Sequence, residues 1–214
     1  MATINLYRKD LKAASRFMAV KDIRYYLCGL LIESNPMESR IIATDGHTLI
    51  VNRCDAKDDN AGNFTGIIPA DTVKTILSWK PPYKNAGDNI PIVITAPDDA
   101  AGEHRAEWCG NIALFKLIDA KFPDYRRVVP DKLSGEPAFY NPDYLVKVAR
   151  AADDYGHKFS HFTLGYNGGS GGVAVINNDC FVVIMPTRQY EVDISATQWV
   201  KAPMQADAAQ SIAA

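Results

Sequence analysis

The chain has 214 residues, 47% of them apolar, and a formal net charge of −2. This length and composition predict a globular protein of one or two domains with a real hydrophobic core. The slightly negative charge argues against a free-standing nucleic-acid-binding module. Apolar stretches are short and interrupted, and residues 1–12 lack a signal-peptide core, so we expect no membrane segment and a cytoplasmic location.

One pattern occurs three times along the chain: a short apolar strand, a helix and three further strands. The first copy is predicted to have a strand at 4–6, a helix at 8–18 and strands at 25–33, 40–45 and 48–54. The second has a strand at 66–68, a helix at 70–80 and strands at 90–95, 104–109 and 112–119. The third has a strand at 137–140, a helix at 142–154 and strands at 159–166, 173–176 and 181–185. Such repeats pack side by side because none buries its apolar face alone, which predicts an α+β fold whose function lies in its shape.

The segments between and after the repeats differ in character. Residues 56–63 are predicted as a polar loop, and residues 121–137 (KFPDYRRVVPDKLSGEP) as a domain linker rich in proline and charge. Residues 168–172 (GGSGG) are predicted as a flexible hairpin tip. Residues 190–200 are a candidate edge strand, and residues 203–214, rich in alanine and glutamine, are expected to be disordered.

The sequence offers little catalytic chemistry. Residues 44–47 (Thr-Asp-Gly-His) place an acid and an imidazole in one turn, but Asp-Gly between two apolar runs is first of all a hairpin signal. No nucleophile motif or phosphate-binding loop accompanies them. The four cysteines form no C-x-x-C pair and are interpreted as small apolar residues, and His157 and His161 lack zinc spacing. We therefore predict no enzyme, no catalytic residue, no metal site and no cofactor.

Separated strings in the chain resemble the bacterial DNA polymerase III beta subunit, the replicative sliding clamp. Residues 18–33 (MAVKDIRYYLCGLLIE) and 42–49 (IATDGHTL) are similar to its middle domain, and residues 121–130 (KFPDYRRVVP) to the segment that leaves that domain. Residues 182–188 (VVIMPTR) are similar to the end of its third domain. The strings occur in the family's order, and the resemblance implies a DNA-clamp fold with helices facing a central hole and sheets outside.

The resemblance also implies how the chain is divided. Residues 1–130 correspond to a full clamp domain like the family's middle domain, and residues 131–190 to half a clamp domain like the end of its third. Residues 191–214 form a C-terminal extension that is expected to be partly disordered. The chain is thus expected to be a shortened member of the family, with three strand–helix–three-strand units.

In clamps, the pocket that grips short peptides of polymerases and clamp loaders lies between these two pieces. The matching positions here, as the resemblance implies, are Leu27, Thr44, Gly46, His47, Thr48, Leu49, Pro123, Arg127, Val128, Val183, Met185, Pro186, Thr187 and Arg188. Apolar walls with a few polar groups suit an extended peptide with leucine or phenylalanine anchors. Thr48 stands where the family usually has arginine, and Thr-Arg-Gln replaces its terminal Met-Arg-Leu, so partner identity and affinity stay open.

Basic residues gather on the predicted helices. Taken alone, they are typical of the solvated sides of amphipathic helices. Because clamp helices line the hole, the resemblance implies that some face double-stranded DNA and contact its phosphates without reading bases; these are Arg8, Lys9, Lys12, Arg16, Lys74, Lys147 and Arg150. A clamp ring holds twelve units, so four copies of a three-unit chain predict a homotetramer whose third units pair across a two-fold axis; dimers and trimers stay open.

These inferences predict a sliding clamp, or processivity factor, that encircles duplex DNA and tethers DNA polymerase and other replication proteins. The alternative is a non-ring adaptor or decoy, a monomer that binds clamp-motif peptides and competes with the host clamp. A third class, an enzyme built around Asp45 and His47, requires that His47→Ala abolish a turnover without harming peptide binding. A ring is distinguished from both by its capture of closed DNA.

Overall fold

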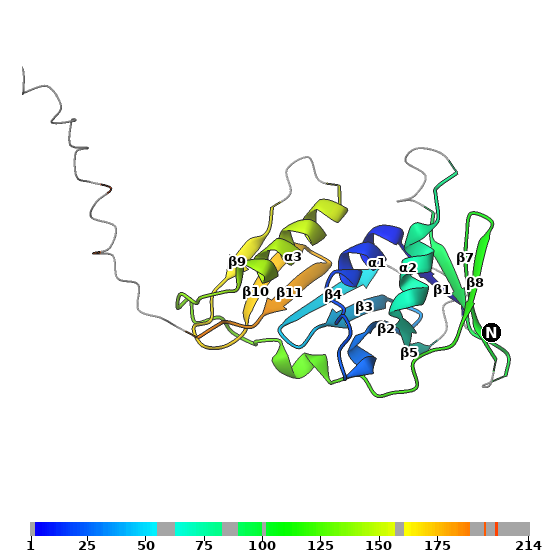
Figure 1. Cartoon of the computed structure of the whole chain (residues 1–214), viewed down its shortest axis with the longest axis horizontal. Helices are drawn as coiled ribbons and strands as arrows, with labels where there is room; N and C mark the ends of the chain where they lie inside the picture. Colours follow the sequence, from blue (N-terminus) through cyan, green and yellow to red (C-terminus); the bar gives the residue numbers. More distant parts are fainter. Residues whose placement is uncertain are drawn as a thin grey trace, which may run out of the picture.

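The computed structural model describes residues 3–54, 63–82, 90–99, 102–156 and 161–188, together with Ser195 and Val200. Most of the predicted loop at 56–63, His157, and nearly all of the predicted C-terminal extension with its candidate edge strand lie outside these residues. Within the described residues, the three repeats follow one another in the predicted order (Figure 1).

The helices and strands of each repeat are short. The first repeat contains β1 (Thr3–Leu6), α1 (Arg8–Ser15), the 3-10 helix η1 (Tyr25–Leu27), β2 (Gly29–Ser34), β3 (Ser39–Thr44) and β4 (Thr48–Cys54). The second contains β5 (Phe64–Pro69), α2 (Ala70–Ser78), β6 (Ile92–Thr95), β7 (His104–Trp108) and β8 (Asn111–Phe115). After the 3-10 helix η2 (Tyr125–Val128), the third contains α3 (Pro142–Asp154), β9 (Thr163–Gly165), β10 (Gly172–Asn177) and β11 (Cys180–Ile184).

The helix ends follow from local chemistry. The predicted helix at 142–154 is confirmed as α3. It begins at this point because the Asn141 side chain accepts a hydrogen bond from the amide of Asp143 (2.9 Å) and proline occupies the first turn. By contrast, α1 ends at Ser15 and not at residue 18, since the amide of Phe17 bonds back to the carbonyl of Ala14, only three residues earlier. The tighter turn closes the helix.

One predicted strand is wrong. Residues 137–140, predicted as the first strand of the third repeat, adopt no strand structure. In the other repeats, the first strand pairs outside its own repeat: β1 joins β6 of the second repeat, and β5 joins β2 of the first. The residues that the structure describes offer no such partner strand to 137–140, and without a neighbour an extended segment makes no hydrogen-bonded ladder.

Exchange of first strands ties the first two repeats together. The four-stranded sheet has the order β1-β6-β7-β8, so β1 completes the sheet of the second repeat. The seven-stranded sheet has the order β5-β2-β3-β4-β11-β10-β9, so β5 completes the sheet of the first repeat. The same sheet continues into the third repeat, because the last strands β4 and β11 pair antiparallel, with Leu49 opposite Val183.

The helices lie together on one side of the sheets. Figure 1 shows α1 between α3 and α2, with η2 on the opposite side. The core under the helices includes Leu11 and Phe17 of the first repeat and Trp108 of the second, each at most 1% exposed. The Trp108 indole N–H donates to the carbonyl of Ile90 (3.0 Å), so its polar atom is satisfied. No helix in the described part of the chain is long and apolar enough to cross a membrane.

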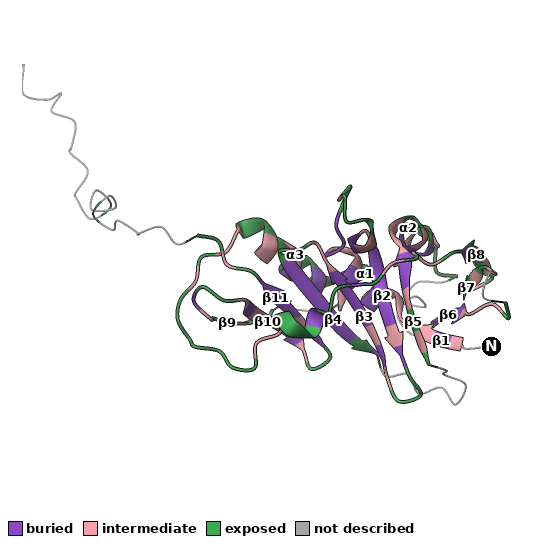
Figure 2. Ribbon diagram, turned by 90° about the horizontal axis from the view of Figure 1, so that it is seen from below, coloured by how far each residue is buried: buried purple, intermediate pink, exposed green. Residues whose placement is uncertain are grey.

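The other face of the seven-stranded sheet is also covered. Figure 2 shows β2, β3, β4 and β11 as largely buried strands. Alternate residues of these strands, among them Leu49 and Val183, form a second apolar cluster with Phe122 and Tyr125, which are 8% and 5% exposed. The first part of the predicted linker at 121–137 is therefore packed on the sheet, which fixes the position of η2 relative to the β4–β11 pair.

Candidate functional site: a pocket at the β4–β11 junction and a basic helix face

The turn between β3 and β4 is organised by Asp45. One oxygen of its carboxylate accepts hydrogen bonds from the amides of His47 (2.9 Å) and Thr48 (2.7 Å) and from the Thr48 hydroxyl (2.9 Å). Gly46 has φ of +91°, a conformation that glycine adopts without strain. The acid and imidazole that a catalytic reading would combine are thus parts of an Asx turn, with the carboxylate bound to backbone.

The third repeat braces this turn. The Lys147 ammonium on α3 lies 2.5 Å from the second oxygen of the Asp45 carboxylate, and the His47 ring stacks on Tyr144 with centroids 5.7 Å apart. Burial tends to raise the pKa of Asp45, but the bonds from Lys147 and the two amides outweigh it, so the pKa lies below its ordinary value. The carboxylate stays charged at neutral pH and holds α3 to the turn.

Several of the predicted pocket residues lie at the β4–β11 junction. Leu27, Leu49 and Val183 are at most 4% exposed and belong to one apolar cluster. Thr48 is 2% exposed and lies opposite Ile184 in the strand pair. Thr48 therefore faces the helix side of the sheet, where Ile184 packs in the core under the helices. Leu27, Leu49 and Val183, on the other face, form the closed floor of the predicted pocket. They come from η1, β4 and β11, so the floor exists only where the first and third repeats join.

The rim of the predicted pocket is more open. The Met185 amide donates to the carbonyl of His47 (2.9 Å), while the Met185 side chain is 40% exposed. Val128 of η2 is 48% exposed. The remaining rim positions are exposed or half-buried; they are Thr44, Gly46, His47, Pro123, Arg127, Pro186, Thr187 and Arg188. Apolar rim atoms over an apolar floor suit the burial of an apolar side chain supplied by a partner.

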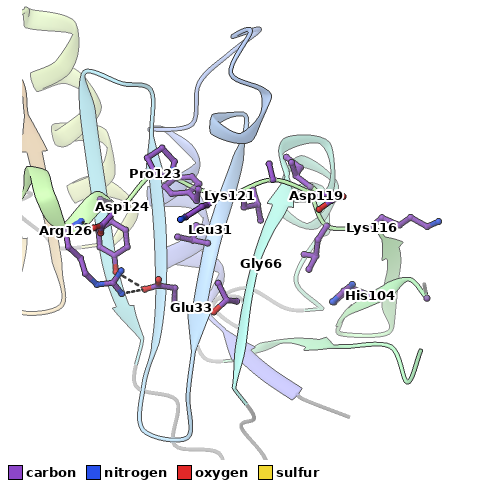
Figure 3. A pocket seen from close by; sticks show the side chains of 18 residues that line it. Leu31, Glu33, Gly66, His104, Lys116, Asp119, Lys121, Pro123, Asp124 and Arg126 are labelled. Atoms are coloured by element: carbon purple, nitrogen blue, oxygen red, sulfur yellow. Dashed lines mark hydrogen bonds and ion pairs between the residues drawn. The ribbon is translucent and has the colours of Figure 1, made fainter. Parts of the chain in front are cut away.

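A groove of about 1110 Å³ lies elsewhere on the same face, and sequence reasoning missed it. It runs beneath the connecting segment between β8 and η2 and contains only Pro123 of the predicted pocket residues. Figure 3 shows Glu33 bound to Arg126 at one end and His104 and Lys116 at the other. The Arg126 guanidinium lies 2.6 Å from the Glu33 carboxylate. No sequence signal marks the groove, because segments from four elements build it.

The predicted DNA-facing residues fall into two groups. Arg8 donates to the carbonyls of Ile76 and Leu77 at the end of α2, and Lys147 is bound to Asp45 as described. These two basic side chains therefore connect elements of the fold. Lys12 and Arg16 lie 2.8 and 2.5 Å from the Asp154 carboxylate. Exposed or half-exposed positions on the three helices hold the others, which are Lys9, Lys74 and Arg150.

Asp154 connects α3 to α1. Its side chain is only 3% exposed, and its two oxygens accept separate bonds from the Arg16 guanidinium at 2.5 and 2.8 Å. Burial tends to raise the pKa of Asp154, but the bonds from Arg16 and Lys12 more than offset this, so the pKa lies below its ordinary value. The stability that the pair contributes is full above the unfolded-state pKa of about 3.9 and is lost as the pH falls through the lower folded-state value.

We expect Asp154→Asn to lower the free energy of unfolding by about 1–3 kcal/mol at pH 7, because charge-assisted bonds at a buried carboxylate are removed. The loss of stability below about pH 4 becomes shallower in the variant, since one linked proton is gone. Chemical denaturation across a pH series measures both effects. The control is Asp153→Asn at the exposed neighbouring position, for which a change within about 0.5 kcal/mol is expected. Equal effects of the two substitutions contradict the role of Asp154.

The family to which the chain is related follows from a match over most of the first two repeats. A family profile described as the central domain of the DNA polymerase III beta subunit matches residues 5–124. The chain belongs to this family. The matched residues include β1 to β8 and the start of the connecting segment, and they exclude the third repeat.

Curated relatives and solved structures support the same assignment. The beta sliding clamp of Pseudomonas aeruginosa is 35% identical over 131 residues, which are 59% of this chain and 33% of that protein. The beta sliding clamp of Escherichia coli K12 is 36% identical over 124 residues, which are 57% of this chain and 31% of that protein. The chain therefore spans about a third of the length of the curated relatives it matches.

The clamp fold predicted from the resemblance is confirmed by solved structures. The Pseudomonas aeruginosa DNA polymerase sliding clamp with ligand superposes with a TM-score of 0.68 at 20% identity, over 88% of this chain and 66% of that one. The Helicobacter pylori beta clamp bound to a DNA ligase peptide gives a TM-score of 0.68 at 13% identity, over 87% and 66%. Both likenesses extend beyond the family-profile match, so the third repeat takes part in the fold.

Sequence reasoning missed several residues that shape the pocket. Tyr144 supports the His47 ring from α3, and Asp45 with Lys147 locks the turn. For Asp45 the sequence holds a partial signal, since Asp-Gly between two apolar runs predicts the turn but not its bond to Lys147. Nothing in the sequence pairs Lys147 with Asp45, which lies 102 positions earlier.

Proposed function

We propose that the protein is a DNA sliding clamp, a non-catalytic processivity factor that forms a homo-oligomeric ring around duplex DNA in the cytoplasm. The observation that carries the proposal is the arrangement of three like repeats, with α3, α1 and α2 side by side on one face and a sheet that continues from one repeat into the next. Family membership and the fold support this reading. A closed ring holds DNA by topology and requires no tight or base-specific contact.

Unit counting favours a tetramer. A clamp ring of twelve units needs four copies of a chain that supplies three, and closed homo-oligomers are commonly built from two-fold contacts. In the described chain, the four-stranded sheet has β1 and β8 as its edges, and the seven-stranded sheet has β5 and β9. Of these, β8 belongs to the second repeat and β9 to the third. Unpaired strand edges invite pairing with another chain, which supports closure through both ends.

The proposed inner surface is the helix face. Lys9, Lys12, Lys74 and Arg150 come from all three helices and would supply positive charge towards phosphates. Two of them also have acidic neighbours, with Lys12 2.8 Å from Asp154 and Lys74 3.2 Å from Asp71. Arg8, Arg16 and Lys147 also belong to the proposed basic set, and their bonds within the chain position the helices.

We further propose that the pocket at the β4–β11 junction tethers peptides of DNA polymerase and of a clamp loader. Its buried floor and partly exposed Met185 and Val128 suit an extended peptide with leucine or phenylalanine anchors. A related clamp, that of Helicobacter pylori, has been solved with a DNA ligase peptide. Thr48 is 2% exposed and lies on the helix side of the sheet, opposite Ile184, so it offers a peptide little direct contact.

Topological capture tests the ring, and a linear duplex with open ends permits threading without a loader. We expect protein incubated with such a duplex to be trapped when both biotinylated ends are capped with streptavidin, and released when the duplex is cut in the middle. Retention in high salt is measured by gel filtration, with ends capped before the protein is added as the control. Equal retention in both orders contradicts a ring. A monomeric mass with intact peptide binding then supports the adaptor.

A further inference from the structure

Among the residues that the structure describes, the third repeat has one strand fewer in its sheet than the first two repeats, and its segment 137–140 joins no sheet. Its sheet ends at β9, the first strand after the helix. In the first two repeats the corresponding strands, β2 and β6, are not edges, since β5 and β1 cover them. The segment 137–140 corresponds to β5 and β1 by its place just before a helix. The repeat thus offers a strand and needs one.

The helix N-caps fix the correspondence residue by residue. The caps of the three helices are Tyr7, Pro69 and Asn141. The residue before the cap pairs with the first core residue of the other repeat in both known cases, with Leu6 opposite Ile92 and Ile68 opposite Leu30. Tyr140 holds that position in the third repeat. Two residues earlier, Ile4 lies opposite Ile94 and Gly66 opposite Ile32; Ala138 holds that position.

The segment 137–140 is already held as β5 is held. The amide of Ile118, three residues after the end of β8, donates to the carbonyl of Ile67 (2.9 Å). The amide of Thr187, three residues after the end of β11, donates to the carbonyl of Phe139 (2.7 Å). Ile67 and Phe139 both stand two residues before the cap. One edge of the segment is therefore fixed by its own repeat, as in β5, and the opposite edge is the one that β5 offers to a strand.

Residues of the segment 137–140 are more exposed than the matching residues of β1 and β5, as expected for a strand without a neighbour. Leu6 and Ile68 are fully buried, whereas Tyr140 is half-buried, and its enclosed hydroxyl finds no hydrogen-bond partner among the residues that the structure describes. Phe139 is 38% exposed, and Tyr166, which follows β9, is 41% exposed. Apolar surface therefore gathers on both sides of the unpaired strand edge.

We propose that two copies of this chain exchange the segment 137–140 through a two-fold axis, each adding it to the β9 edge of the other. The register places Tyr140 opposite Phe162, Phe139 opposite Thr163 and Ala138 opposite Leu164 of the second copy. Phe162 and Leu164 are the helix-side residues of β9 and its lead-in, as the packing of both against the core indicates. The product is one complete clamp domain made from two half domains.

A second copy is the occupant that the third repeat fits, because its surface is self-complementary. Among the described residues, β9 has no partner on one edge, and the pairing of this chain with itself begins only beyond it, where the Gly135 amide donates to the carbonyl of Tyr166 (3.1 Å). Each copy thus has one strand edge and one extended segment in the same relation as the first two repeats, so one two-fold operation satisfies both copies. Main-chain pairing at a sheet edge supplies the affinity. This interface deepens the proposed ring by assigning one of its junctions, yet it does not depend on DNA or on the pocket.

Paired cysteines test the register. The Phe139 carbonyl is bound to Thr187 of its own chain, so Phe139 and Thr163 form a non-hydrogen-bonded pair in the proposed strand pairing, with Cα atoms about 4.5 Å apart, within disulfide reach. We expect full-length Phe139→Cys/Thr163→Cys protein to migrate at twice the chain mass on a non-reducing gel after mild oxidation. Either single variant and the pair Phe139→Cys/Val175→Cys stay at chain mass. Val175 lies opposite Thr163, one strand further away, which is beyond disulfide reach.

A single charged substitution tests the same interface through the strength of self-association, without a covalent link. Ala138→Glu places a carboxylate on the helix side of the proposed pair, where Ile4 is 1% exposed in the first repeat. Sedimentation equilibrium is expected to give at least tenfold weaker self-association for this variant, with the fold checked by circular dichroism. Pro137→Glu, one residue away on the outer face, is the matched control and is expected to leave self-association unchanged.

The outcomes separate this interface from the proposed function. Double-cysteine protein that stays at chain mass, together with unchanged association of Ala138→Glu, overturns the exchange and favours occupation of the β9 edge by residues 189–214 or by another protein. A cross-linked dimer that is never trapped on capped DNA keeps the exchange and rejects the ring. Equal cross-linking of the Val175 control also overturns the proposed register.

Discussion

Met185→Lys is expected to weaken the binding of a clamp-motif peptide by at least about 10-fold and to leave the free energy of unfolding nearly unchanged. Met185 is 40% exposed and sits over the floor formed by Leu49 and Val183. Loss of an apolar contact that becomes buried on binding costs about 1.5–3 kcal/mol, which corresponds to about 10- to 150-fold in affinity. A lysine ammonium beside an apolar peptide anchor adds a desolvation cost. The backbone bond from Met185 to His47 is retained.

Fluorescence anisotropy with a synthetic peptide that carries leucine and phenylalanine anchors measures the effect. The matched control is Met37→Lys in the turn between β2 and β3, where the methionine is 84% exposed. This control introduces the same charge at a position outside the predicted pocket residues, and we expect its affinity for the peptide to be unchanged. If Met185→Lys binds the peptide as tightly as the control does, the pocket assignment is wrong. Lys116→Glu then examines the groove beneath the connecting segment.

Local signals explain why the repeats were predictable. The helix at 142–154 carries its own cap, proline and amphipathic spacing, and those features act within a few residues. The pairing of strands carries no comparable signal, because β1 and β6 are brought together from positions as distant as Thr3 and Thr95. The failure at 137–140 has the same origin. Its sequence is that of a strand, but the structure of a strand depends on a neighbour elsewhere.

The pocket stays a prediction that rests on resemblance and not on chemistry. Leu27, Leu49 and Val183 look like ordinary core residues in the sequence, and their burial agrees with that reading. Their common cluster became visible only when β4 and β11 paired. The roles of the basic residues on the helices were still harder to predict. In the sequence, Arg8 and Lys147 resemble the other basic residues of their helices. Their bonds within the fold, however, are to residues far away in the sequence. Sequence periodicity indicates the helix face on which a charged residue lies, but it does not identify the group to which that residue binds.

Neutralising one basic residue on each helix is expected to have the largest effect on DNA association. The triple variant Lys9→Gln, Lys74→Gln and Arg150→Gln removes charges from α1, α2 and α3 while keeping Arg8, Arg16 and Lys147, which connect elements. Each lost phosphate contact lowers the slope of log affinity against log salt by about 1. We therefore expect association with duplex DNA to fall by at least about 10-fold at low salt, with a flatter salt dependence.

A second triple variant controls for net charge. Lys116→Gln, Lys121→Gln and Lys132→Gln remove the same number of charges from exposed positions between β8 and α3, off the three α-helices. Association rates on end-blocked and open duplexes are measured at several salt concentrations for both variants. If both lose the same affinity and slope, the attraction is a general field effect and the helices do not face DNA. If only the helix variant loses its salt slope, the helix layer is the surface that meets phosphates, and the sheet with its pocket is left free for the peptides of partner proteins.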